Sequence, residues 1–199
     1  MGFITVFGGT FNPIHIGHSE ILRALTVNPL VDKVILMPTK IPPHKVSDCL
    51  AVESDRFNMC KLIASDFDNV EVSDLEIYRQ GKSYTIDTVN ALCDSYPNKK
   101  IAITIGGDML VSFHTWKEYK SILKKCSIFT FKRTDISNED YTNAINNLKS
   151  LGGDIIEINT TITGISSTEI RNSLLINKTS KFLDYRVNDY IVNNNLYGV

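Results

Sequence analysis

Two histidines that follow a glycine-rich turn are the residues of this chain best suited to chemistry. His15 and His18 come soon after Gly8 and Gly9. An apolar, β-prone stretch (residues 3–6) precedes the turn, and an amphipathic helical pattern follows it. A strand, a glycine-rich turn and a helix together aim backbone N–H groups and a helix N-terminus at one point, which favours a bound anion. Imidazole N–H groups at that point donate to phosphate oxygens, so the segment predicts a phosphate site.

A zinc site and a purely structural pair are the competing interpretations of these histidines. Tetrahedral zinc needs further His, Cys or carboxylate ligands at suitable spacing, and the neighbouring sequence supplies none. The strand–turn–helix context argues against histidines that serve only the fold. We therefore predict that His15 and His18 bind phosphate and that the protein forms no metal site of its own.

A second candidate phosphate site begins near residue 165. Ser166 and Glu169 have the spacing of a capping box. In this motif the serine hydroxyl accepts a backbone N–H of the first turn, and the glutamate side chain accepts the backbone N–H of the serine. A helix start with hydroxyl groups, here those of Ser166 and Ser167, also attracts phosphate, and Arg171 lies one turn further along. Two segments far apart in the chain thus both predict polyphosphate binding.

The bulk composition is that of an ordinary globular chain and argues against several kinds of partner. The chain has 199 residues, of which 43% are hydrophobic and 22% are charged. We predict a single domain over 1–199, with 160–199 as its helical C-terminal subregion. The net charge of -1 and the pI of about 6.4 give no indication of a nucleic acid or an anionic membrane as partner.

Signals for export or membrane insertion are missing from the sequence. The N-terminus has no basic region before its short apolar stretch, and no run of about 18 apolar residues occurs. The four cysteines form no C-x-x-C pair and predict reduced, mostly buried thiols. These features predict a cytoplasmic protein without a membrane partner, and they leave open whether it forms a homo-oligomer.

Apolar, β-branched runs alternate with amphipathic stretches along most of the chain. The runs predict strands over 3–7, 33–37, 69–72, 101–105, 126–131 and 154–158. The amphipathic stretches predict helices over 17–27, 54–65, 84–95, 109–124, 138–150, 167–176 and 183–195. Strands that alternate with helices form βαβ units, so the expected fold class is α/β with a doubly wound, mostly parallel sheet. Ligands of such sheets bind beyond the carboxyl ends of the strands.

Signatures of three other chemistries are incomplete in this chain. Gly81-Lys82-Ser83 resembles the end of a Walker A loop, but Glu76 stands where its first glycine belongs. The glycines after the first predicted strand begin no G-x-G-x-x-G, the signature of dinucleotide binding for hydride transfer. A G-x-S-x-G elbow for a serine nucleophile is also missing from the sequence.

Both phosphate motifs resemble those of one enzyme superfamily. The segment with His15 and His18 resembles the HxGH signature of the nucleotidyltransferases, and residues 165–171 resemble the ISSTxIR motif at their far end. Further segments are similar to those of the nicotinate-mononucleotide adenylyltransferase family: residues 42–45 (PPHK), 83–88 (SYTIDT), 105–108 (IGGD) with Trp116 following, and the tail from 185 to 197. The resemblance spans essentially the whole chain.

The resemblance implies a Rossmann-like nucleotidyltransferase fold and transfer of the adenylyl group of ATP to nicotinate mononucleotide, which yields deamido-NAD and pyrophosphate in NAD biosynthesis. The catalytic residues that it implies are His15, His18, Lys45 and Arg171. The ATP site that it implies comprises Gly8, Gly9, Thr10, Phe11, His15, His18, Gly106, Asp108, Ser166, Ser167 and Arg171. The nicotinate-nucleotide site that it implies comprises His44, Lys45, Tyr84, Thr85, Trp116 and Arg133. We expect Mg²⁺ to arrive with ATP, because no carboxylate cluster in the sequence forms a dedicated cage.

Asn12 and Arg133 mark two departures from the family's pattern. The family usually has aspartate at the position of Asn12. Asparagine keeps the turn-forming oxygen and loses the charge, so we expect altered turn electrostatics and retained activity. The family's Arg-Pro-Gly is Arg133-Thr134-Asp135 in this chain, which weakens the role assigned to Arg133.

Two alternatives remain open at this point. One is a related adenylyltransferase that uses nicotinamide mononucleotide or phosphopantetheine, although segments 42–45 and 83–88 argue against phosphopantetheine. The other is a catalytically silent nucleotide-binding regulator. A regulator needs affinity but no groups that stabilise a transition state. The residues that argue against it are His15, His18, Lys45 and Arg171.

Overall fold

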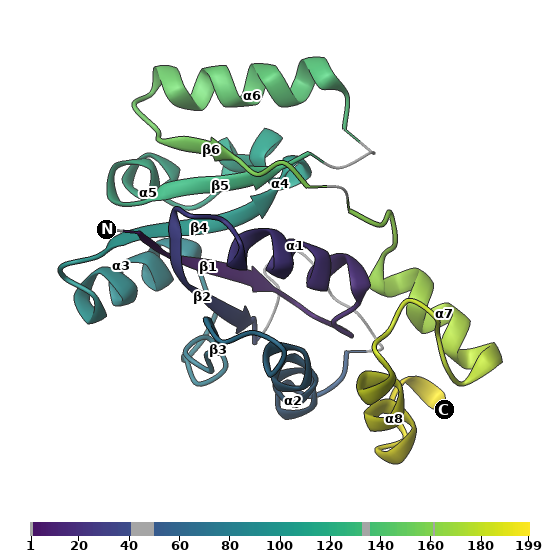
Figure 1. The fold of residues 1–199 in the computed structure, drawn as a ribbon. Coiled ribbons are helices and arrows are strands. Elements are labelled where there is room, and N and C mark those ends of the chain that lie inside the picture. Colours follow the sequence, from purple (N-terminus) through teal and green to yellow (C-terminus); the bar gives the residue numbers. More distant parts are fainter. Residues whose placement is uncertain (1, 41–49, 133–135, 161) are drawn as a thin grey trace.

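A computed structural model describes residues 2–40, 50–132, 136–160 and 162–199 and arranges their strands in one sheet (Figure 1). The strand order is β3-β2-β1-β4-β5-β6, and every neighbouring pair is parallel. The strands are β1 (Phe3–Gly9), β2 (Val31–Pro38), β3 (Val70–Val72), β4 (Lys100–Gly106), β5 (Ser127–Phe131) and β6 (Ile155–Glu157). All six predicted strands are present, and the doubly wound α/β class is confirmed.

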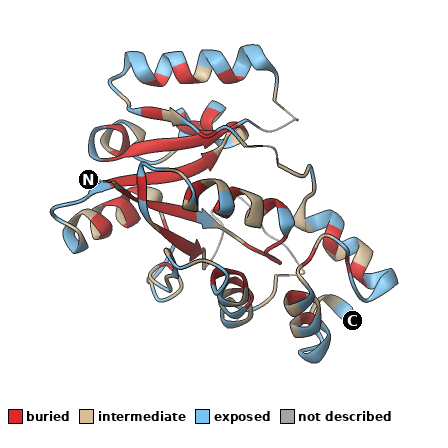
Figure 2. Ribbon diagram, in the orientation of Figure 1, coloured by how far each residue is buried: buried red, intermediate tan, exposed pale blue. Residues whose placement is uncertain are grey.

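Helices cover both faces of the sheet. They are α1 (Ile16–Thr26), α2 (Glu53–Ala64), α3 (Thr85–Ser95), α4 (Gly107–Val111), α5 (Tyr119–Lys125), α6 (Asn138–Ser150), α7 (Ser167–Asn177) and α8 (Tyr185–Asn193), with the 3₁₀ turns η1 (Phe113–Thr115) and η2 (Leu196–Gly198). One buried cluster packs the sheet against α1, α2, α7 and α8, and a second packs it against α3 to α6. The inner strands β1, β2, β4 and β5 are buried over most of their length, whereas the edge strands β3 and β6 and the outer faces of the helices are more exposed (Figure 2). None of the helices in the described ranges has the length and apolar character needed to cross a membrane.

The central strand β1 contributes side chains to both buried clusters. The sheet is extended in one direction from β1 through β2 and β3, and in the other direction through β4, β5 and β6. The side chains of β1 alternate, so that Phe7 belongs to one buried cluster and Val6 to the other. β2 pairs with one edge of β1 and β4 with the other edge. Loops that leave neighbouring strands toward opposite faces open a crevice between them. A ligand site is therefore expected beyond Gly9 and Gly106, the last residues of β1 and β4.

The stretch 109–124 departs from its prediction as one helix, since it contains the end of α4, then η1, then most of α5. The hydroxyl of Ser112 donates to the carbonyl oxygen of Asp108 at 3.1 Å at the end of α4. Trp116 is extended (φ -73°, ψ 144°), and Glu118 has a left-handed φ of 55°. Neither conformation continues an α-helix. Apolar residues on both sides of the break enter the same buried cluster, which is why their spacing imitates one helix.

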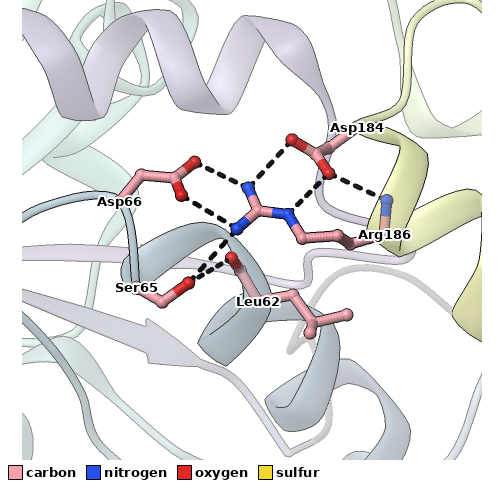
Figure 3. A network of polar contacts seen from close by, with 5 residues as sticks. All are labelled: Leu62, Ser65, Asp66, Asp184 and Arg186. Atoms are coloured by element: carbon pink, nitrogen blue, oxygen red, sulfur yellow. Dashed lines mark hydrogen bonds and ion pairs between the residues drawn. The ribbon is translucent and has the colours of Figure 1, made fainter.

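The C-terminal helices α7 and α8 lie beyond the carboxyl ends of the central strands (Figure 1). Arg186 joins the start of α8 to the end of α2 (Figure 3). Its guanidinium donates to both oxygens of Asp66, at 2.8 and 2.6 Å, and to both oxygens of Asp184, at 2.9 and 3.0 Å. The hydroxyl of Ser65 accepts a further bond at 3.3 Å. Asp184 and Asp66 raise the pKa of the Arg186 guanidinium, and the network attaches the C-terminal helices to the first half of the chain.

Candidate active site

A pocket of about 330 Å³ opens beyond the carboxyl ends of β1 and β5. Its walls come from the loop after β1, the first turns of α1 and α7, and Asp108 at the start of α4. Two helix N-termini therefore meet at one cavity. The aligned peptide dipoles place partial positive charge at the start of each helix, so the cavity is suited to an anion with several charges.

The loop after β1 has an unusual backbone conformation at Phe11. Its φ of 48° lies in the left-handed region, which an L-residue with a large side chain adopts at a cost of about 1–2 kcal/mol. The ring is 2% exposed and packs edge-to-face on Phe7 and His18, with ring centroids 5.5 and 5.0 Å apart. Gly9 makes room for it, because a Cβ there would lie 2.9 Å from the Phe11 ring. The buried ring thus fixes the path of this loop in front of α1.

His15 and His18 lie side by side where α1 begins. Their ring centroids are 3.8 Å apart and the planes are inclined by 35°. His15 is the N-cap residue and is 7% exposed. The backbone N–H of His15 donates to Nδ1 of His18 at 3.2 Å. Because Nδ1 accepts this bond, the neutral imidazole of His18 carries its proton on Nε2, which leaves Nε2 as the donor nitrogen of the ring.

The start of α7 confirms the predicted capping box. The hydroxyl of Ser166 accepts the N–H of Glu169 at 3.2 Å, and the carboxylate of Glu169 accepts the N–H of Ser166 at 2.9 Å. These bonds to Ser166 lower the pKa of Glu169. The hydroxyl of Ser167 donates to the carbonyl oxygen of Pro13 at 3.1 Å. The helix ladder does not use the N–H groups of Ser167 and Thr168, and both residues line the pocket.

Long-range contacts join α7 and the C-terminus to the loop after β1. The guanidinium of Arg171 donates to the carbonyl oxygen of Asn12 at 2.9 Å and to the hydroxyl of Thr168 at 3.2 Å. The side-chain oxygen of Asn12 accepts the hydroxyl of Tyr197 at 2.8 Å and the N–H of Ala51 at 3.0 Å. Both partners donate to this oxygen. The amide oxygen of asparagine accepts these hydrogen bonds as the carboxylate oxygen of an aspartate would. This is the physical basis for expecting that asparagine preserves the turn and the activity.

Comparison with known proteins finds relatives along nearly the whole chain. The cytidylyltransferase-like family model matches residues 6–173. A curated relative from Fusobacterium nucleatum, named "Probable nicotinate-nucleotide adenylyltransferase", is 38% identical over 189 residues, which cover 90% of this chain and 95% of the relative. A relative of the same name from Carboxydothermus hydrogenoformans is 36% identical, over 98% of this chain and 97% of its own length. The chain belongs to the nicotinate-nucleotide adenylyltransferase family.

A solved structure from Plasmodium falciparum has the same fold as this member of the nicotinate-nucleotide adenylyltransferase family. It is a nicotinic acid mononucleotide adenylyltransferase complexed with APC, with a TM-score of 0.81 and 20% sequence identity. The match covers 99% of this chain and 98% of that chain. The same Plasmodium protein complexed with NaAD gives a TM-score of 0.79. The likeness extends over the sheet and the C-terminal helices alike.

Most of the residues predicted for the ATP site of this family member line the 330 Å³ pocket. They are Thr10, Phe11, His15, His18, Asp108, Ser166, Ser167 and Arg171. Gly8 and Gly9 end β1 and Gly106 is the N-cap residue of α4, next to the pocket but outside its lining. His44, Lys45 and Arg133 lie outside the described residues. The structure thus brings the two phosphate motifs together, and the binding roles of their residues stay predictions.

The residues predicted for the nicotinate ring gather at the start of α3. Tyr84 is the N-cap residue of this helix and Thr85 is its first residue. The ammonium of Lys117 lies 4.4 Å from the centroid of the Tyr84 ring. Trp116 precedes it and packs on Phe113 with ring centroids 5.0 Å apart. The structure therefore brings the start of α3 to the segment 116–117, as a shared site requires.

The sequence prediction assigned no functional role to two buried charged residues near these loops. Glu76 is 8% exposed, and its carboxylate accepts the hydroxyl of Thr88 at 2.7 Å. Arg79 donates to the same hydroxyl at 2.9 Å. Burial raises the pKa of the Glu76 carboxyl, and its bond to Thr88 fixes the first turn of α3 beside the predicted nicotinate residues. The second residue is Arg56 of α2, which is 0% exposed.

Proposed function

We propose that this chain transfers the adenylyl group of ATP to nicotinate mononucleotide and releases nicotinate adenine dinucleotide and pyrophosphate, as a step of NAD biosynthesis. The observation that carries the proposal is one pocket in which two helix N-termini, an imidazole pair and Arg171 meet. The family supports the choice of acceptor, because the curated relatives are named for this activity.

The reaction is an in-line attack of the acceptor's 5′-phosphate on the α-phosphorus of ATP. A bond forms between a phosphate oxygen and the α-phosphorus, and the bond to the bridging oxygen breaks, so that its electron pair leaves with pyrophosphate. The nucleophile is already anionic at pH 7, because the second pKa of a phosphate monoester is about 6. The reaction therefore needs no general base, and catalysis rests on positioning and on stabilisation of negative charge.

The pocket residues supply that stabilisation from two helices. His15 and His18 donate to the α-phosphate and to the bridging oxygen as negative charge develops there. The N–H groups of Ser167 and Thr168 and the guanidinium of Arg171 hold the β- and γ-phosphates. Leaving pyrophosphate thus remains bound to fixed donors while the new phosphoanhydride bond forms.

The remaining parts of the two substrates extend from this point toward α4 and α3. Asp108 lines the pocket at the start of α4, and its carboxylate accepts a ribose hydroxyl of adenosine. The nicotinate ring lies at the start of α3, beside Tyr84 and Trp116. His44 and Lys45 bind the acceptor phosphate in this proposal.

Mg²⁺ enters the proposal as part of the ATP substrate. Within the four described ranges, no three His, Cys, Asp or Glu side chains form a group suited to a metal ion. Triphosphate oxygens and water meet the octahedral preference of Mg²⁺ without a protein cage. The ion supplies charge neutralisation on the phosphates, and the protein supplies the donors described above.

The test is a pyrophosphate-release assay with MgATP and each of three acceptors: nicotinate mononucleotide, nicotinamide mononucleotide and phosphopantetheine. We expect fastest release with nicotinate mononucleotide and a product with the mass of nicotinate adenine dinucleotide. A faster reaction with either other acceptor would assign the chain to a different adenylyltransferase. Tight ATP binding without release from any acceptor would identify a silent regulator.

Replacing Arg171 by lysine is expected to raise the KM for ATP about tenfold while leaving the KM for the acceptor nearly unchanged. The guanidinium donates to Asn12 and Thr168 from two nitrogens, and a lysine keeps the charge but loses this fork. Loss of one charge-assisted hydrogen bond is worth about 1.5–3 kcal/mol. Steady-state kinetics with each substrate varied in turn measures the effect, with Arg23→Lys on the exposed face of α1 as the control. The same ATP KM in both variants would remove Arg171 from the phosphate site.

A further inference from the structure

Arg56 occupies a position that the pattern of its helix reserves for an apolar side chain. The buried residues of α2 are Arg56, Met59, Cys60, Ile63 and Ala64, which recur at the spacing of one helical face. Arg56 is 0% exposed and the largest of the fully buried side chains. An arginine in this place demands an explanation, because charged side chains are almost never fully buried unless they are paired.

The guanidinium of Arg56 is paired with backbone carbonyl oxygens from three separate segments. Nη1 donates to the carbonyl oxygens of Thr10 at 2.8 Å and of Thr39 at 2.6 Å. Nη2 donates to that of Lys40 at 3.1 Å, and Nε donates to that of Ala51 at 3.0 Å. All hydrogen bonds that join Arg56 to described residues therefore end on the main chain. Burial lowers the pKa of this guanidinium, which nevertheless stays charged because arginine does not deprotonate in proteins.

These carbonyls belong to the loop after β1 and to the described residues that follow β2 and precede α2. Thr10 is in the loop after β1, which lines the phosphate pocket. Thr39 and Lys40 follow β2, and Ala51 precedes α2. A direct hydrogen bond from the N–H of Thr39 to the carbonyl oxygen of Gly9, at 2.9 Å, joins the residue that follows β2 to the last residue of β1. Arg56 thus ties the loop after β1 to the chain on either side of residues 41–49.

The four carbonyl oxygens explain why a charged side chain occupies this place. Removing a guanidinium from water costs several kcal/mol, and the hydrogen bonds to the carbonyl oxygens offset that cost. A methionine would complete the apolar face of α2, but it would leave these carbonyl oxygens without their donor. A side chain with several donors in a fixed fork joins all three segments at once.

We propose that Arg56 is a positioning residue for adenylyl transfer, which fixes Thr39, Lys40 and Ala51 against the loop after β1. The inference rests on the proposed function, in which the two substrates must meet in line. Misplacement of reacting groups by about 1 Å costs about 10²-fold in rate. Loss of Arg56 should therefore act on kcat, while ATP binding persists.

The kinetic test compares Arg56→Lys and Arg56→Met with the natural protein. We expect kcat to fall about 10- to 100-fold in both variants, with the KM for ATP within about threefold and the ATP Kd from equilibrium dialysis equally unchanged. Arg186→Lys is the matched control, because the Arg186 guanidinium also donates several hydrogen bonds, in a network whose residues do not line the pocket. That control should lower Tm and leave kcat unchanged.

A second readout does not depend on activity. Hydrogen exchange at the amide of Thr39, which bonds to Gly9, should be at least about tenfold faster in Arg56→Lys, whereas amides of the central strand β4 should exchange as in the natural protein. Unchanged kcat in the folded variants, or unchanged exchange at Thr39, would overturn the inference. Failure of both variants to fold would also overturn it, since Arg56 would then serve the whole domain. Inactivity of the natural protein itself would instead refute the proposed function.

Discussion

Replacing His18 by alanine is expected to lower kcat for adenylyl transfer about 10²–10³-fold, the range for loss of one fixed donor to developing charge. The ATP Kd should change far less, because in the proposed function the start of α7 and Arg171 also bind the triphosphate. Stopped-flow or steady-state measurement of pyrophosphate release gives kcat, and equilibrium dialysis gives the Kd for ATP. The matched control is His114→Ala in the exposed part of η1, which should leave kcat unchanged.

The two ring nitrogens of His18 allow its catalytic and structural roles to be separated. Nδ1 accepts the N–H of His15 at the start of α1, and Nε2 is the donor. His18→Asn places an oxygen near Nδ1 and no donor near Nε2, so it should keep the Tm of the natural protein and lose as much kcat as alanine. His18→Gln places an amide nitrogen near Nε2 and should retain part of kcat. Near-normal kcat in His18→Asn would show that the histidine serves only the helix start.

The fold followed from local patterns because each strand and most helices satisfy one simple rule. A parallel strand covered on both faces is apolar almost throughout, and β4 obeys this from Ile101 to Ile105. The same logic failed for 109–124. Helix spacing reports only which residues are buried, and it cannot show that Trp116 and Glu118 leave the helical region between them. That break is what lets segment 116–117 contact Tyr84.

The candidate site was predictable where its chemistry is local and was missed where it depends on distant backbone. The capping box at the start of α7 depends only on Ser166 and on Glu169 three residues later, and the structure confirms it. Arg56 was missed because its partners are carbonyl oxygens, which every sequence has and no side-chain pattern marks. Its one signal is a charge on the apolar face of α2. Tyr197 was also missed, because its hydrogen-bond partner Asn12 is far away in the sequence.

The second large effect expected is a preference for nicotinate mononucleotide over nicotinamide mononucleotide of at least about a hundredfold in kcat/KM, near 2.7 kcal/mol. The start of α3 supplies the physical reason. The N–H groups in its first turn, at Thr85 and Ile86, are not used by the helix ladder, and the ammonium of Lys117 lies over the neighbouring Tyr84 ring. A carboxylate accepts from these donors with charge-assisted bonds about twice as strong as neutral ones. The carboxamide turns an NH₂ toward donors, and unpaired polar groups of this kind reject a substrate by up to about 10⁴-fold or more.

Substitutions of Trp116 test whether the nicotinate ring binds at the start of α3. If its indole packs on the nicotinate ring, Trp116→Ala should raise the KM for nicotinate mononucleotide and leave the KM for ATP nearly unchanged, while Trp116→Phe should keep most of the affinity because it keeps an aromatic face. The indole also packs on Phe113, so a purely structural role is the alternative. That role predicts a lower Tm and a parallel rise of both KM values. Comparable kcat/KM for the acid and the amide in the natural protein would contradict the preference itself, because the donors at the start of α3 would then not face the substrate's carboxylate.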